Sequence, residues 1–151
     1  MKIKAISLVV ALHSGLAFGK AGTSQIPLIE AVKLGHVEDV KRLINEKADV
    51  NHKDNDGMAP LHYAVFHGRL DVVKSLINDC KADIKQTDKD GWEAIHYAAF
   101  KGRTEIAKFL VKDCKINVNT ADNEKRTPLY LAEFHKHHAL AKYLRENGAR
   151  G

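Results

Sequence analysis

Two stretches of the chain decide its fold: DGMAPLHYAVFHG, residues 56–68, and DGWEAIHYAAFKG, residues 90–102. They begin 34 residues apart and are identical at seven of 13 positions. Self-similarity at a fixed period of about 20–50 residues is typical of repeat proteins, in which each unit is one supersecondary structure stacked on the next. The chain is therefore expected to contain further copies on either side of these two.

Related copies do flank the two stretches. The glycine at the end of each stretch, Gly68 or Gly102, has a counterpart in Gly35 and, in the last copy, is replaced by Lys136. The step between copies is 33, 34 and 34 residues, measured at Pro27-Leu28, Pro60-Leu61, Ala94-Ile95 and Pro128-Leu129. The chain therefore divides into four units at about residues 26–53, 54–87, 88–121 and 122–149.

Each unit shows the same order of local signals. An Asp-x-x-Gly turn comes first, with Gly57 or Gly91 supplying the positive φ that such turns require. Lys125 stands in that glycine position in the fourth unit and predicts strain or a different turn there. A short helix follows and ends at Gly68 or Gly102. A second helix then carries apolar residues at the spacing of one buried face: Val72, Val73, Leu76 and Ile77, then Ile106, Ala107, Leu110 and Val111, and finally Leu140, Ala141, Tyr143 and Leu144.

With these signals in place, the chain resembles the ankyrin repeat family. Residues 59–64 (APLHYA), 93–98 (EAIHYA) and 127–132 (TPLYLA) match the family's Thr-Pro-Leu-His-x-Ala, and the resemblance covers about residues 24–149. It implies an all-α repeat solenoid of about four helix-turn-helix units with β-turn tips, occupying residues 26–151. It also implies that His62 and His96 are structural and join one repeat's loop to the next by hydrogen bonds.

The first 19 residues have the pattern of a secretory signal peptide. Lys2 and Lys4 precede an apolar run, and small residues at Ala17 and Gly19 suit a signal peptidase. The run is too short to span a bilayer as a helix. The alternative is an apolar N-terminal core helix. We expect cleavage near Gly19, a linker over residues 20–25, and a mature protein that is exported to the periplasm or secreted and has no membrane span.

Charge and motif content argue against two classes of function. The formal net charge is +5, and Lys and Arg are interleaved with Asp and Glu rather than gathered in a basic stripe, which argues against nucleic-acid binding. The chain contains no G-x-S-x-G, H-E-x-x-H, C-x-x-C or phosphate-loop motif. A solenoid also lacks the deep pocket that most catalysis requires. We therefore expect no enzyme activity and no cofactor.

The two cysteines, Cys80 and Cys114, occupy equivalent places in adjacent units. Equivalent helices of neighbouring units pack roughly 8–10 Å apart, whereas a disulfide requires Cα atoms about 4.4–6.8 Å apart. The spacing therefore predicts two free, largely buried thiols. Each cysteine lies in the one-residue insertion that makes its unit 34 residues long.

The tract His135-Lys136-His137-His138 suggests a metal site at first sight. Adjacent residues of a helix do not face the same way, and no cysteine or carboxylate pair completes a ligand set. We expect no metal site.

A partner would contact the turn tips and the first-helix face, as the resemblance to ankyrin domains implies. One row of candidate contacts follows the turn glycine position, and the other precedes the helix-ending glycine position. The first row is Met58, Trp92 and Arg126, and the second is Phe66-His67, Phe100-Lys101 and Phe134-His135, with Lys33-Leu34 in the first unit. Trp and Arg are frequent interface hot spots, although Trp92 could instead cover Ile95 and the phenylalanines could fill space between units.

Two functional hypotheses follow. The first is a monomeric, exported module that binds a protein partner as an adaptor, inhibitor or immunity-type protein. The second is a redox or stress-linked role in which Cys80 and Cys114 report oxidants or shield a partner enzyme.

Overall fold

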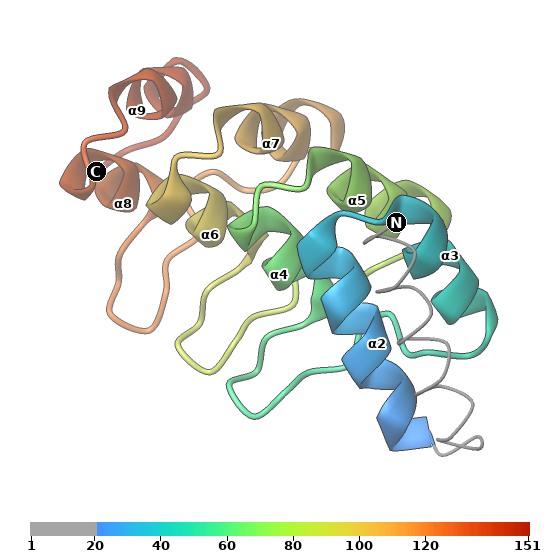
Figure 1. Cartoon of the computed structure of the whole chain (residues 1–151). Coiled ribbons are helices and arrows are strands. Elements are labelled where there is room, and N and C mark those ends of the chain that lie inside the picture. Colours follow the sequence, from blue (N-terminus) through green and yellow to red (C-terminus); the bar gives the residue numbers. More distant parts are fainter. Residues whose placement is uncertain (1–20) are drawn as a thin grey trace.

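The computed structural model describes residues 21–151, with side chains from Pro27 onward; the predicted signal peptide at residues 1–19 lies outside them. Within the described part, the helices form two stacked rows (Figure 1). The inner row contains α2 (Ala21–Leu34), α4 (Pro60–Phe66), α6 (Ala94–Lys101) and α8 (Pro128–Phe134). The outer row contains α3 (Val37–Asn45), α5 (Leu70–Lys74), α7 (Thr104–Lys108) and α9 (His138–Glu146).

Successive helices of each row pack side by side, so that α4 lies between α2 and α6, and α7 lies between α5 and α9. Long loops project from the inner row and carry the turn tips (Figure 1). Residues 21–151 contain no β-strand. The predicted all-α repeat solenoid is confirmed.

The core runs continuously through all four units. Most of the apolar residues predicted on the second helices are buried, whereas Ile77, Val111 and Tyr143 are half-buried and pack against the core. Because each unit contributes one layer to this core, its apolar face is covered only by the units beside it. The large apolar residues that are almost fully buried are Leu28, Val32, Val40, Val65, Val72, Leu76, Ile95, Leu110, Leu140 and Leu144.

Glycine is required where the next unit packs closely. Gly57 has φ +80°, and a Cβ there would lie 2.8 Å from the backbone nitrogen of Lys89 in the next turn. Gly102 has φ +70°, and a Cβ there would lie 2.5 Å from the His137 ring. Lys125 and Lys136 keep the same left-handed conformation, with φ 65° and 62°. The predicted strain at Lys125 is therefore present, whereas the turn keeps its conformation. A side chain fits at this position because no described unit packs against Lys125.

The one-residue insertions of units two and three are absorbed as π-helical turns. These turns, η1 (Ser75–Asp79) and η2 (Phe109–Asp113), continue α5 and α7 directly. The Cys80 N–H donates to the Ser75 carbonyl at 3.0 Å, five residues back, whereas α3 of the 33-residue unit ends with an ordinary four-residue bond. The wider turn therefore accommodates the extra residue without moving the buried face of the helix.

The first unit differs from the prediction. Helix α2 begins at Ala21 and takes in residues 21–25, which were expected to form a linker. Pro27 consequently lies inside the helix rather than at its start. The alignment with Pro60 and Pro128 misplaced this boundary because a proline within a helix and a proline at its first turn look alike in the sequence. No helix in the described part of the chain is long and apolar enough to cross a membrane.

Candidate protein-binding surface

The turn tips of units two, three and four are each organised by one aspartate. Asp54 Oδ1 accepts hydrogen bonds from the N–H groups of Asp56 and Met58, both at 2.9 Å, and its other oxygen accepts the Tyr63 hydroxyl. Burial and this hydrogen bond to Asp54 raise the pKa of Tyr63 to about 12. Asp88 repeats the arrangement with Asp90, Trp92 and Tyr97, and burial and its carboxylate likewise raise the pKa of Tyr97. Successive tips are also joined by backbone hydrogen bonds, from Lys89 N to Asp56 O at 3.1 Å and from Asn123 N to Asp90 O at 3.0 Å.

The motif histidines hold the starts of the inner helices. His62 Nδ1 accepts from the Ala59 N–H at 3.0 Å, and Nε2 lies 3.0 Å from the Gln86 carbonyl in the loop toward the next unit. His96 Nδ1 accepts from the Glu93 N–H at 2.9 Å. Both rings are buried, and burial lowers the pKa of each. These side chains are therefore scaffold, held in the neutral state.

Trp92 is fixed between two units. Its indole Nε1 donates to Asp122 Oδ2 at 2.8 Å, and its ring meets the Tyr97 and Phe100 rings edge-on, with centroids 5.0 and 5.4 Å apart. The Arg126 guanidinium lies 5.7 Å from the indole centroid. The side chain is half-buried, and so it combines the two alternatives left open by the sequence: part of the ring packs inward and part remains accessible.

Arg126 and Met58 also contact other parts of the protein. Arg126 Nε lies 2.7 Å from Asp122 Oδ2, and its Nη1 lies 2.8 Å from Glu124 Oε1. Burial acts to raise the pKa of Asp122, but hydrogen bonds from Arg126, Trp92 and Glu124 lower it overall. Met58 is half-buried against the core. Trp92 and Arg126 of the first predicted row are therefore brought together at the tips, and much of their hydrogen-bonding capacity is used within the protein.

The second predicted row forms a line of aromatic contacts along the inner helices. Phe66 lies 6.2 Å from Tyr97, and Phe100 lies 4.7 Å from His135, each pair joining neighbouring units. Phe66 and Phe100 are half-buried, whereas Phe134 is 66% exposed. The row therefore changes from packing between units to free apolar surface at the end of α8.

Two further exposed apolar side chains lie in this row: Tyr130, which was not predicted as a contact, and Leu34, which was. Tyr130, 44% exposed, stacks on Phe134 with ring centroids 5.9 Å apart and planes 19° apart. Leu34, 39% exposed, marks the other end of the row, on α2. Tyr130 replaces the motif histidine of the earlier units. This departure from the repeat pattern is the feature of the sequence from which its exposure could have been predicted. We refer to the surface formed by α2, α4, α6, α8 and the turn tips as the inner-helix face.

Three further side chains tie the units together where the inner helices end. Arg69 Nε donates to the Lys33 carbonyl at 2.8 Å, Arg103 Nη2 donates to the Phe66 carbonyl at 2.8 Å, and His137 Nε2 lies 3.0 Å from the Phe100 carbonyl. Sequence reasoning missed these ties, although each residue directly follows the helix-ending glycine position. They give His137 a structural role in place of metal binding.

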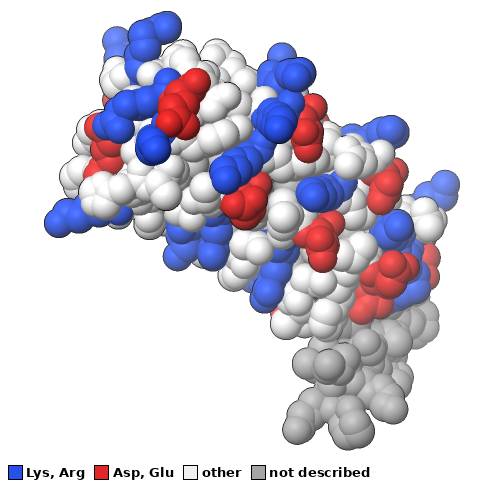
Figure 2. All heavy atoms as spheres, turned by 90° about the horizontal axis from the view of Figure 1, so that it is seen from above, with Lys and Arg blue, Asp and Glu red and all other residues white. Residues whose placement is uncertain are grey.

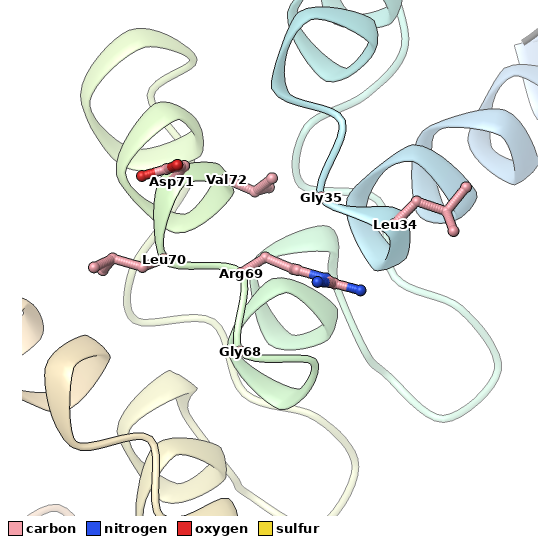
Figure 3. A pocket seen from close by; sticks show the side chains of 7 residues that line it. All are labelled: Leu34, Gly35, Gly68, Arg69, Leu70, Asp71 and Val72. Carbon is pink, nitrogen blue, oxygen red and sulfur yellow. The ribbon is translucent and has the colours of Figure 1, made fainter. Parts of the chain in front are cut away.

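A shallow cavity of about 320 Å³ lies beside the first of these ties. In Figure 3 the Arg69 guanidinium points toward Leu34 and away from Asp71. The cavity is lined by Leu34, Gly35, Gly68, Arg69, Leu70, Asp71 and Val72. It is a notch between units one and two at the edge of the inner-helix face.

The chemistry-bearing side chains outside this face form no assembled centre. Cys80 and Cys114 are free, half-buried thiols, and burial raises the pKa of both. Among residues 21–151 no cluster of three or more His, Cys, Asp or Glu side chains is arranged to hold a metal ion. The protein is thus a helical repeat solenoid whose distinctive surface is a row of aromatic and cationic side chains.

The chain belongs to the ankyrin repeat family. The family model described as "Ankyrin repeats (3 copies)" matches residues 3–88 and 72–151. The first match begins within the segment interpreted above as a signal peptide. Family membership places the chain among protein–protein interaction modules.

Similar proteins include regulatory subunits of larger assemblies. The chain is 39% identical over 69 residues to the 26S proteasome non-ATPase regulatory subunit 10 of Dictyostelium discoideum, covering 45% of this chain and 30% of that protein. It is 35% identical over 78 residues to the human protein phosphatase 1 regulatory subunit 27, covering 52% of this chain and 45% of the relative. The chain therefore spans less than half the length of either relative.

Proposed function

We propose that this protein is a non-enzymatic module that binds a protein partner through the inner-helix face. The observation that carries the proposal is the stacked pair Tyr130 and Phe134, since Phe134 remains 66% exposed at the end of an otherwise packed aromatic row. Tyr is one of the residue types that most often supply binding energy at interfaces, and Phe is enriched at interface cores. The two relatives named as regulatory subunits support a role in regulating a partner.

The side chains of this face have two roles in the proposal. Phe134, Tyr130, Leu34 and Lys101 are exposed and can be covered by a partner at little cost to the fold. Trp92, Arg126, Met58, Phe66, His67, Phe100 and His135 are half-buried, so that they support the exposed set and add contact area around it. At interfaces in general, the residues that contribute most binding energy are surrounded by contacts of lower energy that exclude water from them.

The redox alternative gains no support from the two thiols. The thiolate is the reactive species, and a raised pKa reduces its population at neutral pH. Reactive cysteines generally lie in electropositive surroundings, whereas Asp79 and Asp113 act to raise the pKa of Cys80 and Cys114, respectively.

We also propose that residues 1–19 direct export and are removed. The support is the order of lysines, apolar run and small residues in the sequence. Intact-mass measurement of the protein recovered from periplasm and medium tests this proposal: a chain that begins near residue 20 is expected, and a full-length chain retained inside the cell would contradict it.

A pull-down from the native cell fraction, followed by mass spectrometry, tests the binding function. The bait is the unaltered chain, with two double variants in parallel: Tyr130→Ala with Phe134→Ala, and Cys80→Ser with Cys114→Ser. We expect a partner that the aromatic variant loses and the cysteine variant retains. Loss with the cysteine variant alone would refute the proposal in favour of the redox role.

A further inference from the structure

The segments that join each inner helix to its outer helix are cationic in every unit. The four segments are residues 33–36, 66–69, 100–103 and 134–138, and none of them contains an aspartate or glutamate. We call these segments the inter-helix strip. Its cationic and titratable residues are Lys33, His36, His67, Arg69, Lys101, Arg103, His135, Lys136, His137 and His138.

Few of these charges are neutralised by the protein itself. Lys33 Nζ lies 3.8 Å from Glu30, and His36 lies 3.6 Å from Asp39. None of the other ion pairs found among the described residues involves Arg69, Arg103, Lys101 or Lys136. Asp71 lines the notch beside Arg69, but the guanidinium points away from it (Figure 3).

The helix dipole favours the cations of the strip but gives them no carboxylate partner. Cations at the C-terminal ends of inner helices, such as Lys33 and Lys101, do complement the negative end of the dipole. Arg69 and Arg103 are the N-cap residues of α5 and α7, but their guanidinium groups donate to the last-turn carbonyls of α2 and α4, where the negative end of the dipole also favours a cation. Their hydrogen bonds to the carbonyls of the preceding unit explain their position but leave their charge without a carboxylate partner.

The strip is held in place and borders aromatic rings. The ties of Arg69 and Arg103 repeat once per unit and fix their side chains before any partner arrives. Lys101 Nζ lies 4.8 Å from the Phe66 ring centroid, and Lys33 Nζ lies 5.2 Å from that of Tyr63. The environment of His67 fits this picture, since burial and the surrounding Lys33, Arg69, Arg103 and Lys101 lower its pKa.

The opposite edge of the inner-helix face, formed by the turn tips, carries charges of both signs. Its acidic residues are Asp54, Asp56, Asp88, Asp90, Asp122 and Glu124, and its basic residues are Lys53, Lys89, Lys125 and Arg126. Lys89 pairs with Asp56, and Arg126 pairs with Asp122 and Glu124. Figure 2 shows Lys and Arg side chains beside Asp and Glu side chains over the outer-helix side as well. The inter-helix strip therefore differs from both of these surfaces in containing no acidic residue.

We propose that the inter-helix strip binds an acidic segment of the protein partner, with its carboxylates against Lys33, Arg69 and Lys101 and an apolar side chain against Phe134. This inference rests on the proposed binding function and adds the partner's chemistry. Complementary charge fixes the register and orientation of an interface, and Arg in particular binds carboxylates in a fixed, bidentate geometry.

Selection from a random displayed-peptide library on the immobilised protein tests this inference. Selected peptides are measured by fluorescence anisotropy against two double variants that each remove two positive charges. One is Lys33→Gln with Lys101→Gln in the strip, and the other is Lys112→Gln with Lys142→Gln on exposed outer-helix positions. Neither strip substitution removes a hydrogen-bonded tie between units, but each removes a contact between a lysine and an aromatic ring of unit two, so thermal unfolding of each variant checks the fold.

We expect selected peptides rich in Asp and Glu, with affinity reduced about tenfold by the strip variant and little changed by the outer variant. Peptides without an acidic excess, or acidic peptides weakened equally by both variants, would overturn the inference and leave the binding function standing. Failure to select any peptide would count against both. A short single-stranded DNA that binds and is weakened only by the strip variant would assign the strip to phosphates and would also overturn the inference.

Discussion

The indole Nε1 of Trp92 donates a hydrogen bond to Asp122 Oδ2 at 2.8 Å, across the boundary between the third and fourth units. This oxygen is available because unit four carries Leu131 where the earlier units carry Tyr63 and Tyr97, whose hydroxyls occupy the equivalent aspartate oxygen. One departure from the repeat thus frees an acceptor, and another, Trp92 in place of Met58, supplies the donor.

Trp92→Phe should therefore destabilise the protein while keeping an aromatic ring at the tip. Removing the donor leaves a partly enclosed carboxylate with one fewer partner, and hydrogen bonds to charged groups contribute about 1.5–3 kcal/mol. We expect the free energy of unfolding to fall by about 1–2 kcal/mol, measured by urea denaturation. Circular dichroism is the signal to follow, because Trp92 is the only tryptophan in the sequence and its replacement removes tryptophan fluorescence. Met58→Leu, at the equivalent tip, is the control and should change stability little; equal effects of the two substitutions would argue against the hydrogen bond.

The same substitution in opposite directions tests the role of glycine. Lys136→Gly relieves a non-glycine residue at φ 62° that no unit within residues 21–151 packs against as His137 packs on Gly102, and it should stabilise the protein by about 0.5–1 kcal/mol. Gly102→Lys places a Cβ 2.5 Å from the His137 ring in the equivalent position and should be strongly destabilising. Similar shifts in thermal midpoint for both variants would contradict this account.

Deletion of Cys80 tests the interpretation of the π-helical turn. Unit two would then have the 33-residue spacing of unit one, in which Lys47 follows an ordinary helical end with φ 81°. We expect a folded protein with a thermal midpoint shifted by only a few degrees, since the insertion lies beyond the buried positions of the helix. Deletion of the fully buried Leu76 is the contrasting control and should prevent folding; a Cys80 deletion that also unfolds the chain would show that the wider turn is required.

Stability should decrease between pH 7 and pH 5 because of the motif histidines. Burial lowers the pKa of His62 and His96 below 6.5, so that on acidification the unfolded chain takes up protons before the folded chain does. The associated stability is complete above pH 6.5 and is lost as the pH falls toward the folded-state pKa values. His96→Gln should flatten the pH dependence of urea unfolding relative to His138→Gln at an exposed position; an unchanged slope in His96→Gln would refute the assignment.

The fold was predictable from the sequence because its causes are local and periodic. Positive φ at Gly57, prolines at helix starts and one buried face per second helix each recur at the repeat spacing. The π-helical turns were not predictable, because an extra residue before Ala82 can either loop outward or widen the helix. The start of α2 was misplaced because a proline within a helix and a proline at its first turn look alike in the sequence.

The candidate site was only partly predictable for a related reason. Register places Phe66, Phe100 and Phe134 at equivalent positions, but their exposure depends on whether another unit lies beside them. Phe134 is open since no described unit follows it, whereas Phe100 is covered by His135. The ties made by Arg69 and Arg103 depend on a carbonyl 36 or 37 residues earlier in the chain, which no local pattern reveals.

Site-specific photo-crosslinking tests the central claim most directly. A photoreactive phenylalanine analogue is placed at Phe134 on the inner-helix face or, as the matched aromatic control, at Tyr143 on outer helix α9, and the protein is irradiated in its native cell fraction. We predict a partner adduct from position 134 and none from position 143. An adduct from position 143 alone would show that the partner binds the outer helices and would contradict the account.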